Sequence, residues 1–597
     1  MSESPTNFMN TTLRSLIHGA TLLGCLSPGL ITRATAAPTH LVRQSPVLVT
    51  NVAPGVILVD FGRVAFGNVQ LTPPPGATGE IKVHFGEAFA QGRIDRKPPG
   101  SVRYAVTSAA LAGNPLVVAP APDKRNTTHP SAIRTPSEWG TVLPFRWVEI
   151  AGWPGELIAT QISRQAAFAE TWDDAAAAFE CSDEMLNRIW GLCRYSIKAT
   201  TFAGVYVDGD RERIPYEADA YLNQLSHYYT DRDLQMARDT FDHLMKHATW
   251  PTEWAPHMVF MAHADWRQTG DTNWLAARYD ALKSKLLLER VGQNGLVHSS
   301  NAQMTRDDIV DWPVGERDGY VFTERNTVVN AFHLRALQLM ADLGRVIGRE
   351  ADAAAFARRE AKARPVFQEA FFDAGRGLYR DGATTDHASL HANLFPLAFG
   401  LVPEANRATV ADWLVARGMK CSVYAAQYLL EGLFENGHGA AAIDLMVAPG
   451  DRSWRHMVES GTTITWEAWD QKYKSNQDWN HAWGAAPANL LPRYVLGVQA
   501  LKPGWKQVLI QPHPGSLKTA SGKVPTPCGP VRVEWKREDG FELSFELPEG
   551  MTADVELPAI EGAKQVFVNN RPVVAKVEKD RWVLAEALSG RATVELK

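Results

Sequence analysis

The stretch Ser182-Asp-Glu-Met-Leu-Asn-Arg-Ile-Trp-Gly-Leu-Cys193 marks a change in the hydrophobic period of the chain. Ser182 and Asp183 are residue types that cap helix N-termini. The apolar residues after them recur at the spacing of one helix face, at Leu186, Ile189, Trp190 and Cys193. A helical region therefore begins near this point.

Further amphipathic blocks follow, joined by loops rich in glycine, proline, aspartate and tryptophan. The clear ones span residues 233–246, 274–288, 327–347, 351–372, 403–417, 424–436 and 482–495. About a dozen helices in one region are typical of a toroid of paired helices. We predict an (α/α)6 barrel over residues 178–502, with a pocket formed by the loops at one end.

The chain before the barrel has the period of two that β-strands show. Strand-like runs begin at Val56, Ile81 and Arg146, with proline and glycine turns between them. We predict an N-terminal β-sandwich over residues 45–175.

The chain after the barrel returns to the same period. Val531-Arg-Val-Glu-Trp535 and Phe541-Glu-Leu-Ser-Phe-Glu-Leu547 alternate on either side of an Asp-Gly hairpin signal. A C-terminal β-sandwich over residues 503–597 is expected. The protein is thus predicted to be multidomain, with a central all-α barrel flanked by two β-domains.

The composition narrows the function classes. The chain has 597 residues, is 45% hydrophobic and carries a net charge of −5 without a long basic run, which argues against nucleic acid as a partner. Beyond the N-terminus, no stretch is apolar for long enough to span a membrane. The 19 tryptophans mostly suit core packing, although flat indole faces also bind sugar rings. The oligomeric state stays undetermined.

The first 37 residues are typical of an export signal. Arg14 precedes an apolar stretch over residues 16–30, and Ala34-Thr-Ala36 resembles a cleavage site. Leu22-Leu-Gly-Cys25 can instead be interpreted as a lipoprotein attachment site, and this alternative stays open. We expect residues 1–37 to be a signal peptide and the mature protein to be periplasmic or extracellular.

Motifs for metals and cofactors are missing from the sequence. The four cysteines after the leader form no Cys-x-x-Cys pair and are interpreted as mostly buried thiols, with a Cys181–Cys193 disulfide as the alternative. The sequence contains no His-Glu-x-x-His, no phosphate-binding glycine loop and no EF-hand spacing. No metal and no organic cofactor is therefore implied.

The densest charge cluster is Asp208-Gly-Asp-Arg-Glu-Arg-Ile-Pro-Tyr-Glu-Ala-Asp219. A general acid must keep its proton near neutral pH; neighbouring aspartates favour that form of Glu212, and the flanking arginines oppose it. Such a cluster beside Tyr216 suits the floor of a sugar site that includes an acid catalyst. The alternative is an ion-pair network at a helix start.

A second carboxylate, Glu467, lies in Thr463-Ile-Thr-Trp-Glu-Ala-Trp469, framed by two tryptophans. Two separated carboxylates in aromatic surroundings are what hydrolysis of a glycosidic bond requires. We expect Glu467 to hold the attacking water, unless it is a core-edge residue bonded to backbone amides. The same pocket is expected to include Asp311, Trp312 and His481 from loops, and Trp254 and Trp266. A structural histidine with satisfied hydrogen bonds is the alternative for His481, and core packing is the alternative for each tryptophan.

At these residues the chain resembles the α-L-rhamnosidases of glycoside hydrolase family 78. The family motif is of the type Asp-Gly-x-Lys-Arg-Asp/Glu-Arg-Leu-Pro-Trp-x-Gly-Asp, and the resemblance covers most of the chain. It continues through Ile309-Val-Asp-Trp-Pro313, Asn330-Ala-Phe-His-Leu-Arg-Ala336, Thr462-Thr-Ile-Thr-Trp-Glu467, Asn480-His481 and Pro503-Gly-Trp-Lys-Gln-Val-Leu-Ile-Gln-Pro-His513.

The resemblance implies an (α/α)6 barrel flanked by β-domains and hydrolysis with inversion. It implies that Glu212 is the general acid and Glu467 the general base. The rhamnose would be held by Asp208, Arg211, Tyr216, Asp219, Trp312 and His481, since a 6-deoxy sugar offers a methyl group to an aromatic wall and hydroxyls to polar groups.

The motif also departs from the family pattern. It is one residue shorter between Asp208 and Arg211, and Tyr216 stands where tryptophan is usual. Glu217 adds a carboxylate that could compete for the acid role. Our interpretation is an exo-acting, inverting α-L-rhamnosidase without accessory modules. A related (α/α)6 enzyme acting on another deoxy or uronic sugar, a lyase included, and a non-catalytic sugar-binding protein remain alternatives.

Overall fold

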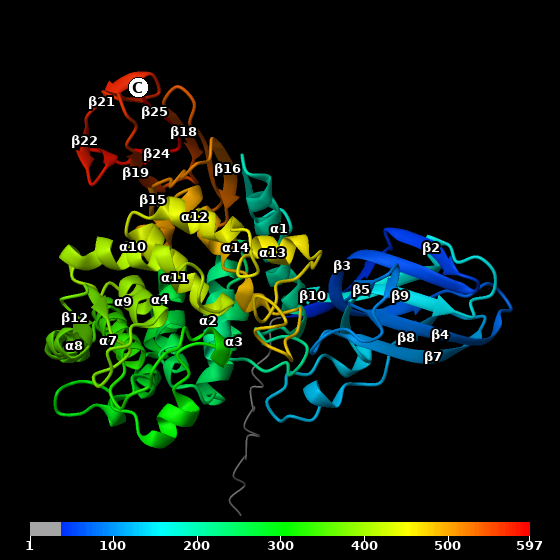
Figure 1. Ribbon diagram of the computed structural model, residues 1–597. Helices are drawn as coiled ribbons and strands as arrows, with labels where there is room; N and C mark the ends of the chain where they lie inside the picture. Colours follow the sequence, from blue (N-terminus) through cyan, green and yellow to red (C-terminus); the bar gives the residue numbers. More distant parts are fainter. Residues whose placement is uncertain (1–37) are drawn as a thin grey trace, which may run out of the picture. The chain divides into compact units, whose positions relative to one another are not determined.

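The computed structural model describes residues 38–597 (Figure 1). The predicted signal peptide and the alternative attachment site at Cys25 lie outside these residues. Among the helices of residues 38–597, none combines the length and apolar character that a bilayer crossing requires.

The N-terminal β-domain is built on one antiparallel sheet, with β3 (Val56–Leu71) in its middle. Inward-facing apolar residues of β3, such as Val59 and Val69, pack with Val83 and Phe145 in a core of their own. The strands are β1 (Thr39–Gln44), β2 (Leu48–Ala53), β3, β4 (Thr78–Gly86), β7 (Tyr104–Ala112), β8 (Leu116–Val118), β9 (Leu143–Ala151) and β10 (Ile162–Ala169), with a short hairpin of β5 (Phe89–Ala90) and β6 (Arg93–Ile94).

The middle of the chain forms the predicted barrel. Within residues 38–597, six helices contact one another in a closed ring in the order α2, α4, α7, α9, α11, α14. These inner helices are α2 (Glu217–Tyr228), α4 (His257–Thr269), α7 (Thr327–Val346), α9 (Leu390–Ala398), α11 (Val423–Glu435) and α14 (Pro487–Leu490), the last continued by a π-turn (Leu491–Val495).

The remaining helices cover the outside of this ring and alternate with the inner helices along the chain. They are α1 (Glu184–Ala199), α3 (Gln235–Lys246), α5 (Thr272–Ala276), α6 (Tyr279–Leu282), α8 (Glu350–Phe371), α10 (Arg407–Arg417), α12 (Gly439–Val447) and α13 (Trp454–Glu459). A short hairpin, β12 (Phe372–Asp373) and β13 (Leu378–Tyr379), joins α8 to α9. The predicted (α/α)6 fold is confirmed.

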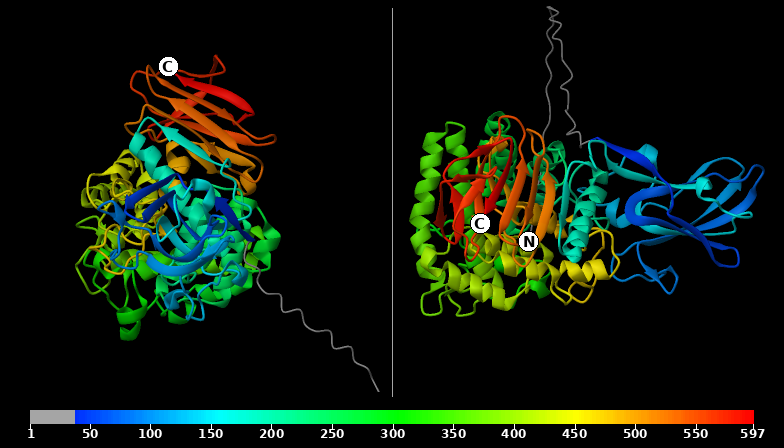
Figure 2. Two further views of the ribbon diagram at one scale, coloured as in Figure 1. Left: turned by 90° about the vertical axis from the view of Figure 1, so that its right-hand side faces the viewer. Right: turned by 90° about the horizontal axis from the view of Figure 1, so that it is seen from above.

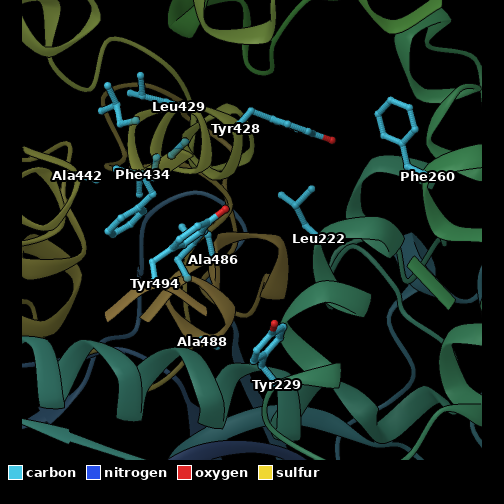
Figure 3. Close-up of a cluster of buried hydrophobic side chains, with 14 of the residues drawn as sticks. Leu222, Tyr229, Phe260, Tyr428, Leu429, Phe434, Ala442, Ala486, Ala488 and Tyr494 are labelled. Carbon is cyan, nitrogen blue, oxygen red and sulfur yellow. The ribbon is translucent and has the colours of Figure 1, made fainter. Parts of the chain in front are cut away.

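Aromatic side chains fill the centre of the ring. Figure 3 shows Leu222, Phe260 and Tyr428 pointing toward one another from α2, α4 and α11. Phe332 of α7 packs its ring against Phe260 and Tyr428, with centroids 5.8 and 6.1 Å apart. Because this plug closes the axis, a site in the barrel must lie at one of its ends.

The C-terminal β-domain contains two sheets (Figure 2). One has the order β11-β16-β17-β18-β25-β20-β21 and the other β14-β15-β19-β23-β22, with β24 beside β19. The strands are β14 (Val498–Ala500), β15 (Gln507–Ile510), β16 (Thr519–Val524), β17 (Val531–Lys536), β18 (Phe541–Glu546), β19 (Thr552–Pro558), β20 (Val566–Val568), β21 (Arg571–Val573), β22 (Ala575–Glu578), β23 (Arg581–Leu584), β24 (Leu588–Ser589) and β25 (Arg591–Leu596).

Two strands that the sequence prediction places inside the barrel pair with these sheets instead. β11 (Ala178–Cys181) pairs antiparallel with β16, and β14 pairs antiparallel with β15. The C-terminal domain therefore holds the chain immediately before and after the helices. Within residues 38–597 the four cysteines are free thiols; Cys181, Cys193 and Cys421 are buried and Cys528 is exposed.

Candidate active site

The predicted site residues gather at the N-terminal ends of the inner helices. The charged motif leads into α2, for which Tyr216 is the N-cap. The segment with Glu467 and His481 leads into α14, and the loop with Trp312 leads into α7. Helix N-termini carry partial positive charge and so favour the carboxylates that these loops supply.

Arg211 joins the two predicted catalytic carboxylates. Its Nη1 and Nη2 donate to Glu467 Oε2 and Oε1 at 2.6 and 2.9 Å, and its Nε donates to Glu212 Oε1 at 3.2 Å. Burial lowers the pKa of Arg211, but Glu467 raises it, with a net shift upward. One guanidinium therefore lies between Glu212 and Glu467 and sets their separation.

The surroundings of the two glutamates differ. The side chain of Glu212 is 36% exposed and accepts a second hydrogen bond, from the Tyr216 hydroxyl at 3.1 Å. The side chain of Glu467 is 3% exposed and has a second cation, Lys474, 3.4 Å from Oε1. Glu212 can thus reach a group arriving from solvent, whereas Glu467 faces the interior.

Asp208 closes the motif loop. Its Oδ1 accepts a hydrogen bond from the backbone of Ile214 at 2.9 Å. Burial, followed by the charge of Glu212, raises the pKa of Asp208 well above its ordinary value. Burial and the neighbouring charge of Glu212 thus favour the protonated form of Asp208, which can donate a hydrogen bond.

Asp219, His481 and Asp478 form a buried row. The Nε2 of His481 lies 2.7 Å from Asp219 Oδ1, and its Nδ1 lies 3.3 Å from Asp478 Oδ1. Burial would lower the pKa of His481, but the hydrogen bonds to Asp219 and Asp478 raise it well above its ordinary value. Both ring nitrogens are taken by carboxylates, so His481 positions Asp219 here and has no free N–H for a sugar.

Asp311, predicted to bind substrate, has both carboxylate oxygens bonded to groups of the protein. Its Oδ2 lies 2.6 Å from His391 Nε2 and accepts the backbone N–H of Ser422 at 2.9 Å, and its Oδ1 bonds to the Ser422 hydroxyl and to the backbone of Trp312. Asp311 is fully buried and its oxygens are occupied. It anchors the loop that carries Trp312.

Lys474 contacts both Glu467 and Trp312. Its ammonium is 5.1 Å from the centre of the Trp312 indole ring, which places Trp312 near the site. Trp250 meets Trp312 edge-on, with ring centroids 6.5 Å apart, and is 49% exposed. The sequence analysis identified neither Lys474 nor Trp250 as a site residue. The Trp250-Pro251 pair in the loop before α4 is the sequence signal that could have indicated Trp250.

Trp254 and Trp266 are predicted to line the same pocket, but they lie at different places on α4 and the loop before it. Trp254, before α4, contacts the Tyr216 ring, with centroids 5.5 Å apart. Trp266 lies near the C-terminal end of α4 and, with Asp342 and Arg345, lines a hollow there. The structure therefore places Trp266 apart from the other predicted site residues, because α4 carries the chain from one end of the barrel to the other.

Glu217 does not face the proposed acid position. Its two oxygens accept hydrogen bonds from the backbone N–H and the hydroxyl of Thr249, and its side chain is buried. Burial raises the pKa of Glu217. The residue ties the start of α2 to the loop before Trp250.

Glu467, Asp478 and His481 offer ligand atoms within 4.8 Å of one another, a spacing that suits a small cation. Arg211 and Lys474 already supply positive charge to Glu467. His481 favours its protonated form, whereas a metal ligand needs a free lone pair. The donor chemistry does not fit a metal.

Comparison with known proteins decides the family. Residues 174–495 match the bacterial α-L-rhamnosidase 6-hairpin glycosidase domain. Residues 50–168 and 497–571 match the concanavalin-like and C-terminal domains of the same proteins. The chain belongs to the bacterial α-L-rhamnosidase family. The resemblance to glycoside hydrolase family 78 is thereby confirmed.

Family members share the fold at low sequence identity. An α-L-rhamnosidase of Streptomyces avermitilis is 24% identical over 568 residues, which are 89% of this chain and 51% of that protein. The crystal structure of S. avermitilis α-L-rhamnosidase complexed with L-rhamnose has a TM-score of 0.77 at 20% identity, over 94% of this chain and 54% of that one. A family 78 rhamnosidase of Bacillus sp. GL1 has a TM-score of 0.70 at 19% identity, over 85% and 54%. The chain thus spans about half the length of these relatives.

Proposed function

We propose that this protein is a glycoside hydrolase that removes terminal α-L-rhamnosyl residues with inversion of the anomeric centre. The observation that carries the proposal is the pair Glu212 and Glu467, one half-exposed and one buried, joined by Arg211 in a chain of the rhamnosidase family. Rhamnose is bound in the S. avermitilis relative, which supports this sugar as the substrate class.

In the proposed reaction Glu467 takes a proton from a water molecule, whose oxygen attacks the anomeric carbon. The glycosidic C–O bond breaks on the opposite face, and Glu212 donates its proton to the departing oxygen. Inverting enzymes hold their carboxyl groups about 6.5–9.5 Å apart to leave room for the water. A guanidinium between Glu212 and Glu467 supports such a wide spacing over direct contact.

The sugar ring would be held by groups beside this pair. Tyr216 and Trp254 supply an aromatic wall for the methyl group of rhamnose, and Asp208 and Arg211 supply polar partners for its hydroxyls. A uronic sugar would need a free cation, whereas Arg211 and Lys474 already face Glu467. These contacts favour a neutral deoxy sugar over a uronate.

The test is release of nitrophenol from a panel of para-nitrophenyl glycosides, with the α-L-rhamnoside among them. Turnover of the rhamnoside is expected, and proton NMR of the first product should show β-L-rhamnose before mutarotation. Formation of α-L-rhamnose first would contradict inversion. Binding of L-rhamnose without turnover would identify a sugar-binding protein, and an ultraviolet-absorbing unsaturated product would identify a lyase.

Export is proposed on the N-terminal sequence pattern alone. Expression of the full chain in a Gram-negative host is expected to yield a periplasmic protein whose N-terminus follows Ala36. Retention of the intact leader in the cytoplasm would contradict this proposal, and a lipid-modified N-terminus at Cys25 would support the lipoprotein alternative.

A further inference from the structure

The loop that carries Arg211 and Glu212 is held by the N-terminal β-domain. Arg103, directly before β7, donates from Nε to Asp210 Oδ2 at 2.7 Å, and its Nη2 contacts the same oxygen. Arg213 occupies the other oxygen of Asp210 through Nε and Nη2, at 3.0 and 2.6 Å. The side chains of Arg103 and Asp210 are 9% and 2% exposed, so water hardly screens this pair.

A second link joins the same domain to the segment that carries His481. Glu87, directly after β4, accepts from Asn480 Nδ2 at 2.9 Å and from the backbone of Arg103 at 2.6 Å. Asn480 Oδ1 accepts the backbone N–H of Asp210 at 2.7 Å. Arg103, Asp210, Asn480 and Glu87 thus form a closed, buried circuit across the two domains.

The motif loop needs such support from outside. Arg213 has a backbone φ of 56°, in the left-handed region that L-residues other than glycine rarely adopt. Gly209 has φ 128°, and a Cβ there would lie 2.7 Å from Asp478 Oδ2. The loop is therefore strained and packed closely against the segment of Asp478 and Asn480.

We propose that Arg103 and Glu87 are positioning residues for catalysis, so that the N-terminal β-domain is part of the catalytic apparatus. This inference rests on the proposed rhamnosidase function. Arg103 acts by fixing Asp210, and thereby the direction in which Arg211 and Glu212 leave the loop. Small misplacements of a reacting group can cost about 10²-fold in rate.

The test compares Arg103→Met with Arg146→Met in the full chain. Arg146 also holds a carboxylate with two nitrogens, Asp60 at 2.8 Å for both contacts, but this pair lies within the β-domain. We expect Arg103→Met to lower kcat about ten- to hundred-fold with little change in KM, and Arg103→Lys to restore part of the loss. Arg146→Met should keep kcat.

Comparing substrates with different leaving groups shows whether Arg103 positions Glu212 or only stabilises the fold. If Arg103 positions Glu212, the loss in Arg103→Met is larger for an alkyl rhamnoside, which needs protonation, than for the nitrophenyl rhamnoside. Equal losses on both substrates, or a loss no larger than that of Arg146→Met, would overturn the inference. Should Arg103→Met not fold, Arg103→Lys and Glu87→Gln are measured against the same control. Turnover by the wild-type chain, measured first, tests the proposed function separately.

Discussion

The two ends of the barrel differ although both are rich in charge. At the N-terminal ends of the inner helices, carboxylates converge on Arg211 and His481. At the C-terminal ends, arginines gather, among them Arg335 and Arg493, and Arg493 pairs with Glu431 at 2.8 Å. The carboxylates at the N-terminal ends suit the partial positive charge of helix N-termini. The arginines at the other end are balanced by glutamates of α11, such as Glu431.

A cavity by itself does not identify the catalytic end. The C-terminal end has one of about 390 Å³, lined by Tyr221, Tyr229, Arg335 and Arg493. What sets the N-terminal end apart is a half-exposed carboxylate beside a buried one, both on long loops. Charged side chains and a cavity can arise from the fold alone, whereas a solvent-exposed Glu212 beside a buried Glu467 is what an acid–base mechanism requires.

The largest contrast is expected between Glu467→Gln and Glu431→Gln, which remove matched arginine-bound acids from opposite ends. Losing a general base costs about 10²–10⁴-fold in rate, so kcat on the nitrophenyl rhamnoside should fall by that factor in Glu467→Gln. Glu431→Gln should remain within about twofold of wild type. Comparable losses in the two variants would remove the distinction between the ends.

Glu212→Gln should show a loss that depends on the leaving group. Nitrophenolate departs with little protonation, so the variant should keep much more activity on that substrate than on an alkyl rhamnoside, where a loss of about 10²-fold or more is expected. Kinetics on both substrates check this. A loss independent of the leaving group would contradict the role of Glu212 as the acid.

Arg211→Lys tests whether one guanidinium sets the spacing of the two acids. A lysine cannot form a bidentate contact to Glu467 and, at the same time, the contact that Nε makes to Glu212. We expect kcat to fall about tenfold or more while circular dichroism stays unchanged. Arg493→Lys at the other end is the control and should leave kcat intact.

His481 should make stability depend on pH. Its pKa is raised above 6.5 by Asp219 and Asp478, so its ion pairs contribute fully below about pH 6.5 and are lost as the pH rises through the folded-state pKa. Urea unfolding should show the free energy of unfolding falling with rising pH more steeply in wild type than in His481→Gln, by about 1.4 kcal/mol per pH unit at most. Parallel curves would contradict a charged His481.

The smallest contrast pairs two tryptophans. Trp250→Ala should raise KM a few-fold for rhamnosides with aromatic aglycones, because an exposed indole beside Trp312 offers them a stacking face. Trp266→Ala, at the other end, should leave kcat and KM unchanged. Steady-state kinetics of both variants decide this, and an effect of Trp266→Ala on KM would place the aglycone elsewhere.

The sequence predicts the fold class because the outer helices are amphipathic. The blocks at 351–372 and 403–417 correspond to α8 and α10, each with a buried and an exposed face. The inner helix α9 was not predicted, because most of it is buried and its interior includes Pro396, so no polar face sets a period. The block at 274–288 is divided into α5, α6 and a 3-10 turn (Lys283–Lys285), and Leu287, near its end, adopts φ 56°.

The sequence predicts which residue types the site contains, but not which side chains contact one another. Glu212 and Glu467 are 255 positions apart, and their link through Arg211 depends on loops that only the closed ring brings together. Asp311 is occupied by Ser422 and His391, which are distant in sequence. Trp266 lies apart from Trp254 because the thirteen residues of α4 span about 20 Å along the barrel axis.

The pairing of β11 with β16 has a consequence for synthesis. β11 ends at Cys181 and β16 begins at Thr519, so the first strand leaves the ribosome long before its partner exists. While the helices of the ring are being synthesised, β11 has no strand partner and presents an open edge, which is a template for aggregation. A nascent chain that stalls before β16 therefore exposes the edge of β11. This edge is covered only when β16 has been synthesised and pairs with β11.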